Sequence, residues 1–199
     1  MRQCRNFCRL SNRMQSIDTP RLRLRPMVEE DASFLVALLN EPAFLRHIGD
    51  KGVRTVEDAK RYMEGPQQSY REHGYGMAVV DLQESDAPIG ICGLVRRDWL
   101  PAADLGFAFL PEYSGRGFAL EAAQATLDFA RDELGMDEVL AIVSPANAAS
   151  LRLLGKLGFG DAGRTQPPGE GQPILLFSLH LPLERAVAET PMAEHRLAG

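Results

Sequence analysis

Cysteine and histidine are scarce in this chain. Its 199 residues include three cysteines, Cys4, Cys8 and Cys92, and four histidines. Three thiols cannot build the disulfide framework of a small secreted domain, and the Cys4/Cys8 pair has no second ligand pair at zinc-site spacing. The sequence therefore predicts a protein without a metal site from a reducing compartment, and we expect it in the cytoplasm.

Long apolar stretches are also missing. No uninterrupted apolar run approaches the roughly 18 residues that a transmembrane helix needs. The 18 glycines and 13 prolines follow no repeating period, which excludes a collagen-like chain. The 45% apolar and 25% charged residues are typical of a globular domain that does not enter a membrane.

The chain has little positive charge outside its N-terminus. Residues 1–17 hold four arginines and no acid, so the remainder carries 18 basic against 27 acidic side chains. Such a body attracts a phosphate backbone poorly, and we do not expect nucleic acid as a main ligand. Cationic or amine-bearing partners suit this charge better.

Residues 1–17 form a basic extension without the apolar segment of a secretory signal. Three interpretations remain open: a transit-like peptide, a basic tail, and an upstream start codon with Met14 as the true first residue. We expect one domain over residues 18–183 and a C-terminal tail over 184–199.

The spacing of apolar residues predicts the helices and strands. Polar and apolar residues alternate over 21–25, which indicates a strand, and further strands are expected at 76–82, 89–97, 104–110, 139–143 (fully apolar) and 174–181. A spacing of three and four residues indicates helices over 29–39, 55–72 (interrupted at Gly65-Pro66), 119–134 and 147–156. Hairpins followed by a β-α-β unit imply an α/β (α+β) single domain with a mixed sheet of six to seven strands and helices on both faces.

The segment 110–119 lies between an expected strand and an expected helix, with Gly115 and Gly117 flanking Arg116. A glycine-rich turn that enters a helix exposes backbone N–H groups at the positive end of the helix dipole, which suits a phosphate. The segment lacks the Lys-Ser/Thr ending of a Walker loop, and Leu120 occupies the place of the third glycine of a Rossmann fingerprint. This motif alone does not distinguish a phosphate site from an ordinary turn at the start of a helix.

Four motifs in order resemble the Gcn5-related N-acetyltransferase (GNAT) superfamily, and within it the branch that includes the ribosomal-protein N-terminal acetyltransferases. Segments 19–25 and 104–107 are similar to the branch's opening strand and fourth strand. Segment 114–119 resembles the pyrophosphate loop, with Ser114 where Gln or Arg is usual, and Glu121-Ala122 follows it as in the branch. Segment 147–159 resembles the second motif. The resemblance covers about residues 18–183 and implies a mostly antiparallel sheet.

The resemblance implies transfer of an acetyl group from acetyl-CoA to a primary amine by direct attack in a ternary complex. The acceptor is either a protein N-terminal α-amine or a small-molecule amine, and an idle acetyl-CoA-binding sensor or scaffold is the alternative. Exposed edge strands are compatible with a homodimer. The resemblance also implies the coenzyme contacts, which are Phe107, Ala108, Phe109, Gly115, Arg116, Gly117, Phe118, Ala119 and Asn147.

The catalytic residues depart from the usual pattern. Many relatives have a tyrosine four residues before the glycine of the second motif, where this chain has Leu154. Ser150 is the substitute candidate for the general acid, and a hydroxyl that only bonds the helix backbone is its alternative. Asp104 stands where the branch often has a glutamate and is the candidate base, with an ion-paired carboxylate as its alternative. Such a site favours an α-amine over a lysine, because an amine of pKa near 7.8 is roughly a quarter neutral at pH 7.4.

Aromatic and histidine side chains gather in sequence on the expected acceptor side. Either pocket lining or core packing accounts for them, and His73 is a second candidate base. The side chains are Phe44, His47, Tyr70, His73, Tyr75 and Trp99.

Overall fold

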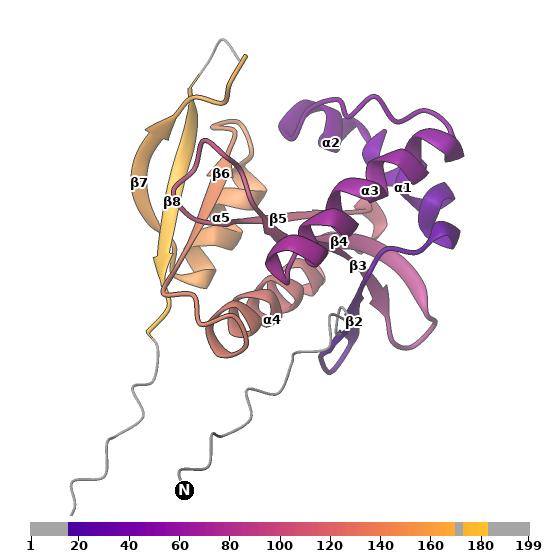
Figure 1. Cartoon of the computed structure of the whole chain (residues 1–199), viewed down its shortest axis with the longest axis horizontal. Coiled ribbons are helices and arrows are strands. Elements are labelled where there is room, and N and C mark those ends of the chain that lie inside the picture. Colours follow the sequence, from indigo (N-terminus) through magenta and orange to yellow (C-terminus); the bar gives the residue numbers. More distant parts are fainter. Residues whose placement is uncertain (1–15, 170–172, 183–199) are drawn as a thin grey trace, which may run out of the picture.

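The computed structural model describes residues 16–169 and 173–182, and these form one sheet covered by helices (Figure 1). Eight strands lie in the order β1-β2-β3-β4-β5-β6-β8-β7. Every neighbouring pair is antiparallel except β5 and β6. The mixed, mostly antiparallel sheet is thereby confirmed, with eight strands in place of six to seven. The strands are β1 Ile17–Asp18, β2 Leu22–Arg25, β3 Met77–Leu82, β4 Ala87–Val95, β5 Asp104–Phe109, β6 Glu138–Val143, β7 Gly160–Thr165 and β8 Ile174–His180.

The first strand begins one residue ahead of the expected domain boundary, because Ile17 pairs with Leu24 of β2. Residues 1–15 of the basic extension, which include Cys4 and Cys8, and the expected tail over 184–199 lie outside the described residues. Within the described residues, no helix combines the length and apolarity needed to cross a membrane. The helices are η1 Glu29–Asp31, α1 Ala32–Leu39, α2 Pro42–His47, α3 Val56–His73, η2 Pro111–Tyr113, α4 Phe118–Asp132 and α5 Ala148–Leu157.

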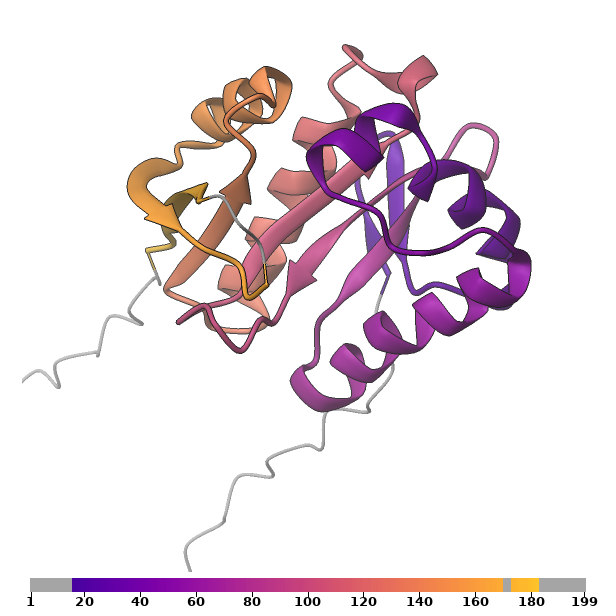
Figure 2. The ribbon, with the colours of Figure 1, turned by 90° about the horizontal axis from the view of Figure 1, so that it is seen from above.

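Helices cover both faces of the sheet, as expected. Figure 1 shows α1, α2 and α3 above the central strands and α4 below them, and in the view from above α1–α3 lie in front (Figure 2). Successive residues of a strand point to opposite faces, so Ile91 of β4 packs with α1–α3 while Cys92 packs with α4 and α5. The two apolar cores are therefore separated by the sheet itself.

Helix α3 is one continuous helix of 18 residues, so the expected interruption at Gly65-Pro66 is wrong. A capping box closes its N-terminus: Thr55 Oγ1 accepts from the Asp58 N–H, and the Asp58 carboxylate accepts from the Thr55 N–H. Gly74 closes its C-terminus with a φ of 79°. These caps and the burial of Ala59 and Met63 stabilise α3 enough for it to continue past Pro66, although a proline inside a helix is unfavourable.

Candidate active site

The sheet opens between β5 and β6. Strands β4 and β5 pair along six residues, whereas β5 and β6 share the single residue pair Asp104–Leu140. The burial of β5 changes at the same place, from buried at Asp104 and Leu105 to half-buried from Gly106 onward. Beyond Asp104 the backbone of β5 has no strand partner on the β6 side in the described part of the chain.

A cleft of about 550 Å³ occupies this opening, within the size range of small-molecule sites. Residues 104–108 of β5 line one wall, and residues 141–144 with the start of α5 line the opposite wall. Segments of α2 and α3 line it from above the sheet. The cleft includes Phe107 and Ala108 of the predicted coenzyme contacts but not Phe109, whose ring packs over the bare backbone of Gly90.

The loop after β5 has the backbone geometry of an anion site. Gly115 and Gly117 have φ values of 74° and 83°, which L side chains rarely adopt, and Gly117 caps α4. A Cβ added at Gly115 would meet no atom within 4 Å, so the main chain there is open to an approaching ligand. The first intrahelical bond runs from the Glu121 N–H to Gly117 O at 3.0 Å, which leaves the preceding N–H groups of the helix available to an anion.

Three side chains, Thr19, Arg21 and Glu121, hold this loop and are called here the loop anchor. The Glu121 carboxylate accepts from Thr19 Oγ1 at 2.6 Å and from Arg21 Nε at 2.6 Å. Arg21 Nη1 also donates to the carbonyl oxygen of Arg116 at 3.0 Å. Burial raises the pKa of Glu121, but the bonds from Thr19 and Arg21 outweigh it and place the pKa below its ordinary value. The loop anchor thus joins the segment directly before β2 to the glycine loop.

The anchor also orders the aromatic ring beneath the loop. The guanidinium carbons of Arg21 and Arg116 lie 4.6 Å and 4.9 Å from the centre of the buried Phe118 ring. Arg116 itself is exposed, and its charge lies within the loop. Ala119 follows in the first turn of α4, where a small side chain leaves the amides accessible.

Asp104 lies where β5 and β6 separate. It is 1% exposed, lines the cleft, and accepts a hydrogen bond from Arg97 Nε at 2.8 Å. Burial raises the pKa of the Asp104 carboxyl above its ordinary value, although the Arg97 guanidinium acts in the opposite direction. The Asp104 carboxylate is therefore ion-paired with Arg97, and it also lines the cleft.

Asn147 and Ser150 lie on the opposite wall of the cleft. The Asn147 side chain caps α5, its Oδ1 accepting from the Ser150 N–H at 3.1 Å. Both side chains are half-buried, and both line the cleft. Leu154, at the position where relatives have tyrosine, is fully buried and also borders the cleft.

Comparison with known proteins accounts for this geometry. A family model described as an acetyltransferase (GNAT) domain matches residues 21–160. The chain belongs to the GNAT acetyltransferase family. The match includes the open strand and the start of α5, which line the cleft, and also the loop anchor from Arg21 onward and the glycine loop, which are not among the residues that line it.

Relatives of this acetyltransferase support the same assignment. It is 28% identical over 171 residues to an uncharacterized N-acetyltransferase, p20, of Bacillus licheniformis, covering 83% of this chain and 96% of the relative. An acetyltransferase from Agrobacterium tumefaciens has a TM-score of 0.73 at 24% identity, covering 91% of this chain and all of the other. The ribosomal α-N-protein acetyltransferase RimL in complex with coenzyme A has a TM-score of 0.72 at 17% identity, covering 84% and 98%. The two structures establish a shared fold.

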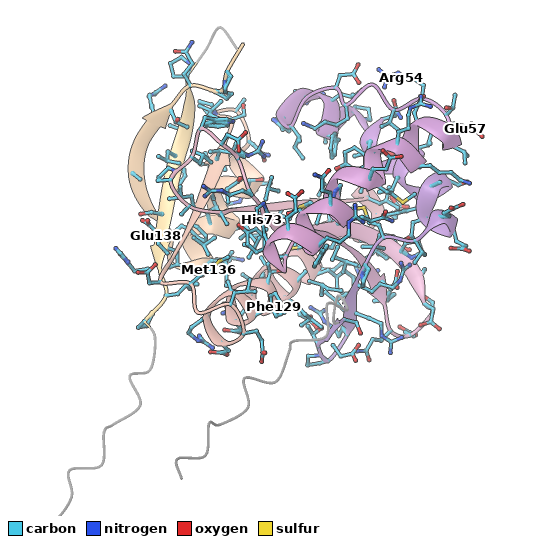
Figure 3. The ribbon with its side chains drawn as sticks, in the orientation of Figure 1. Arg54, Glu57, His73, Phe129, Met136 and Glu138 are labelled. Carbon is cyan, nitrogen blue, oxygen red and sulfur yellow. The ribbon has the colours of Figure 1, made fainter. Side chains whose placement is uncertain are left out.

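The aromatic and histidine side chains that gather in the sequence divide between the lining of the cleft and positions outside it. Phe44, His47 and Trp99 line the cleft, and His47 Nδ1 is buried without a partner among the described residues. His73 lies at the C-terminal end of α3, away from α2, with its ring centre 5.7 Å from that of Tyr75 (Figure 3). Tyr70, His73 and Tyr75 are not among the residues that line the cleft, so His73 is not placed to act as a base there.

The lining of the cleft also includes polar and charged residues that the sequence does not single out, among them Lys51, Tyr62, Arg96 and Arg97. Arg96 and Arg97 directly follow the apolar strand β4, and this adjacency was visible in the sequence. No group of three or more His, Cys, Asp or Glu side chains within residues 16–169 and 173–182 is arranged to hold a metal ion.

Proposed function

We propose that this acetyltransferase transfers the acetyl group of acetyl-CoA to a primary amine by direct attack in a ternary complex. The acceptor is a protein N-terminal α-amine or a small-molecule amine. The observation that carries the proposal is the opening of the sheet after Asp104–Leu140, directly ahead of a glycine loop that ends in the N-terminus of α4. The open strand suits an extended amide-bearing arm, and the loop suits its diphosphate.

The residues present fit acetyl-CoA. The amides of residues 115–119 would hold the diphosphate, with the charge of Arg116 added, and Phe118 would support the loop from below. The free backbone edge over Phe107–Phe109 would pair with the pantetheine arm, and Asn147 would contact it from α5. When bound, acetyl-CoA supplies a thioester carbonyl that accepts the amine nitrogen. An N–H of the β5 edge would donate to that carbonyl oxygen as negative charge develops on it.

Two side chains are proposed for proton transfer. Asp104 would take the proton that the attacking amine releases, since it faces the cleft at the vertex of the two strands. Ser150 would supply a proton to the departing sulfur from the opposite wall. Orientation carries much of the remaining rate, because well-placed groups reach effective molarities of about 10⁵ M or more.

The proposal is tested by following release of free coenzyme A from acetyl-CoA. Release is expected only when an amine is present, and a peptide with a free α-amine is expected to react faster than an N-blocked peptide with one lysine. Tight binding of acetyl-CoA without release for any amine would contradict the proposal and favour an idle sensor. A faster reaction of the lysine peptide would contradict only the preference for an α-amine.

Replacement of Arg21 by alanine is expected to raise KM for acetyl-CoA about tenfold with little change in kcat, because a charge-assisted bond to the loop contributes about 1.5 kcal/mol. Steady-state kinetics with varied acetyl-CoA measure the effect. Arg23→Ala is the matched control, since Arg23 lies two residues further along the chain, in β2, and pairs with the exposed Asp18. Equal changes in both variants would show that the loop anchor does not position the coenzyme.

Replacement of Asp104 by asparagine is expected to lower kcat about 100-fold and to remove the acidic limb of the pH–rate profile. In the wild type that limb lies above the ordinary aspartate range, because burial raises the pKa and activity falls as the carboxylate is protonated. Asp81→Asn controls for loss of a buried, arginine-paired carboxylate, since Asp81 bonds Arg25 outside the cleft. An unchanged pH profile in Asp104→Asn would exclude Asp104 as the base.

A further inference from the structure

The charge that lines the cleft is opposite to the charge of the chain. Among the described residues that line it, Lys51, Arg96 and Arg97 are basic and Asp104 is the acidic one. Asp104 is already paired with Arg97, so the lining retains an excess of positive charge. Residues 18–199 as a whole carry 27 acidic and 18 basic side chains. A positive lining in an acidic chain indicates a ligand with negative charge.

The two arginines, Arg96 and Arg97, lie at the end of β5 that is remote from the glycine loop. Arg96 directly follows β4, and Arg97 bonds Asp104, the first residue of β5. The glycine loop follows the last residue of β5, Phe109. A strand of this length separates its ends by about 17 Å. With the diphosphate on the glycine loop, the two arginines would lie at the opposite end of β5, where an acceptor could enter the cleft.

Arg96 has unused hydrogen-bonding capacity. Within the described part of the chain its side chain is in no ion pair, and its one hydrogen bond is the long contact from Nη1 to Pro101 O at 3.5 Å. A guanidinium has five N–H donors in a planar fork that matches a carboxylate or a phosphate. Arg97, by contrast, is 32% exposed at its side chain and held by Asp104.

We infer that the acceptor of this acetyltransferase is a small primary amine that also carries an anionic group, a carboxylate or a phosphate, bound by Arg96. The inference rests on the proposed function and names its substrate class. The amine lies toward Asp104 and the anion toward Arg96, an arrangement that suits an α-amino acid or an amino sugar phosphate. A volume of about 550 Å³, shared with the coenzyme arm, suits a small acceptor.

The test compares matched acceptors with and without the anion. One pair is an α-amino acid and its decarboxylated amine, the second is an amino sugar phosphate and the free amino sugar, and a third is a peptide with acidic residues at its N-terminus and its neutral analogue. In the wild type the anionic member of the first or second pair is expected to show at least a tenfold higher kcat/KM, and which pair responds distinguishes carboxylate from phosphate.

Variants of Arg96 separate binding from chemistry. Arg96→Ala is expected to raise KM for the anionic acceptor about tenfold and to leave KM for the neutral amine and for acetyl-CoA unchanged, and Arg96→Lys is expected to restore part of the loss. Arg131→Ala, which removes the same charge at the far end of α4, is expected to change neither. Calorimetry with the N-acetylated anionic product gives a readout without turnover, and Arg96→Ala is expected to bind it about tenfold more weakly.

The outcomes distinguish the inference from the proposed function. Efficient acetylation of neutral amines with no gain from an anion, or equal behaviour of Arg96→Ala and wild type, would overturn the inference and leave the acetyltransferase activity standing. Transfer confined to acidic peptides would overturn the assignment to a small acceptor. Failure of every amine to release coenzyme A would overturn the proposed function, and the inference about its acceptor would fall with it.

Discussion

Replacement of Gly117 by valine is expected to lower kcat/KM for acetyl-CoA by a factor of at least about 100. Gly117 has a φ of 83° at the cap of α4, a conformation that costs a β-branched residue about 1–3 kcal/mol. A Cβ there would also lie 3.4 Å from Arg21 Nη2 of the loop anchor. Loss of two hydrogen bonds from backbone amides to a charged diphosphate costs about 3 kcal/mol, which corresponds to a factor of about 100 in kcat/KM.

The measurement is coenzyme affinity by calorimetry together with kcat/KM. Gly135→Val is the control, because Gly135 also has a positive φ of 63° but lies in the loop after α4, with no atom within 4 Å of an added Cβ. Both variants lose stability through backbone strain, and only Gly117→Val is expected to lose the coenzyme. Normal affinity in Gly117→Val would remove the glycine loop from the proposed site.

Replacement of Gly93 by alanine is expected to destabilise the fold by about 3 kcal/mol or more, among the largest effects of a single methyl group. An added Cβ would lie 2.1 Å from the backbone oxygen of Gly76 and 2.8 Å from the Cα of Met77. Gly93 pairs with Met77 on one side and Gly106 on the other, in the middle of the sheet. Neither backbone can yield without separating β3 from β4.

Chemical denaturation followed by circular dichroism measures this loss as a lower midpoint at an unchanged slope. Gly155→Ala is the control, since Gly155 is exposed in α5 with no atom within 4 Å of an added Cβ. There the same methyl group is expected to stabilise the protein by up to about 1 kcal/mol through helix propensity. A small effect at Gly93 would mean that β3 and β4 are packed less closely than described.

The elements with sustained periodicity were predictable from the sequence, and those without it were not. Alternation over 21–25 and the spacing over 119–134 correspond to β2 and α4. The six-residue helix α2 is too short to display a helical period, and β7, with the sequence GDAGRT, has no apolar alternation. The error at Gly65-Pro66 has another cause, because a local breaker was outweighed by the two caps and the packing of α3.

The same division holds for the candidate site. Linear motifs located the glycine loop, Asn147 and Asp104, because each is a local pattern. The bond between Arg21 and Glu121 joins residues 100 positions apart, and the Arg97–Asp104 pair spans a loop, so spacing could not reveal either. The basic lining of the cleft could not be predicted from the overall acidity of the chain, because a net charge does not say where Arg96 and Arg97 lie.

The single residue pair that joins β5 to β6, Asp104–Leu140, divides the sheet into two parts, β1–β5 and β6–β8. A ligand bound between β5 and β6 contacts both parts of the sheet and connects them as a strand would. Its affinity is then coupled to the stiffness of the whole sheet. Amide protons of β8 from Leu175 to His180, which do not line the cleft, should therefore exchange more slowly once the ligand is bound.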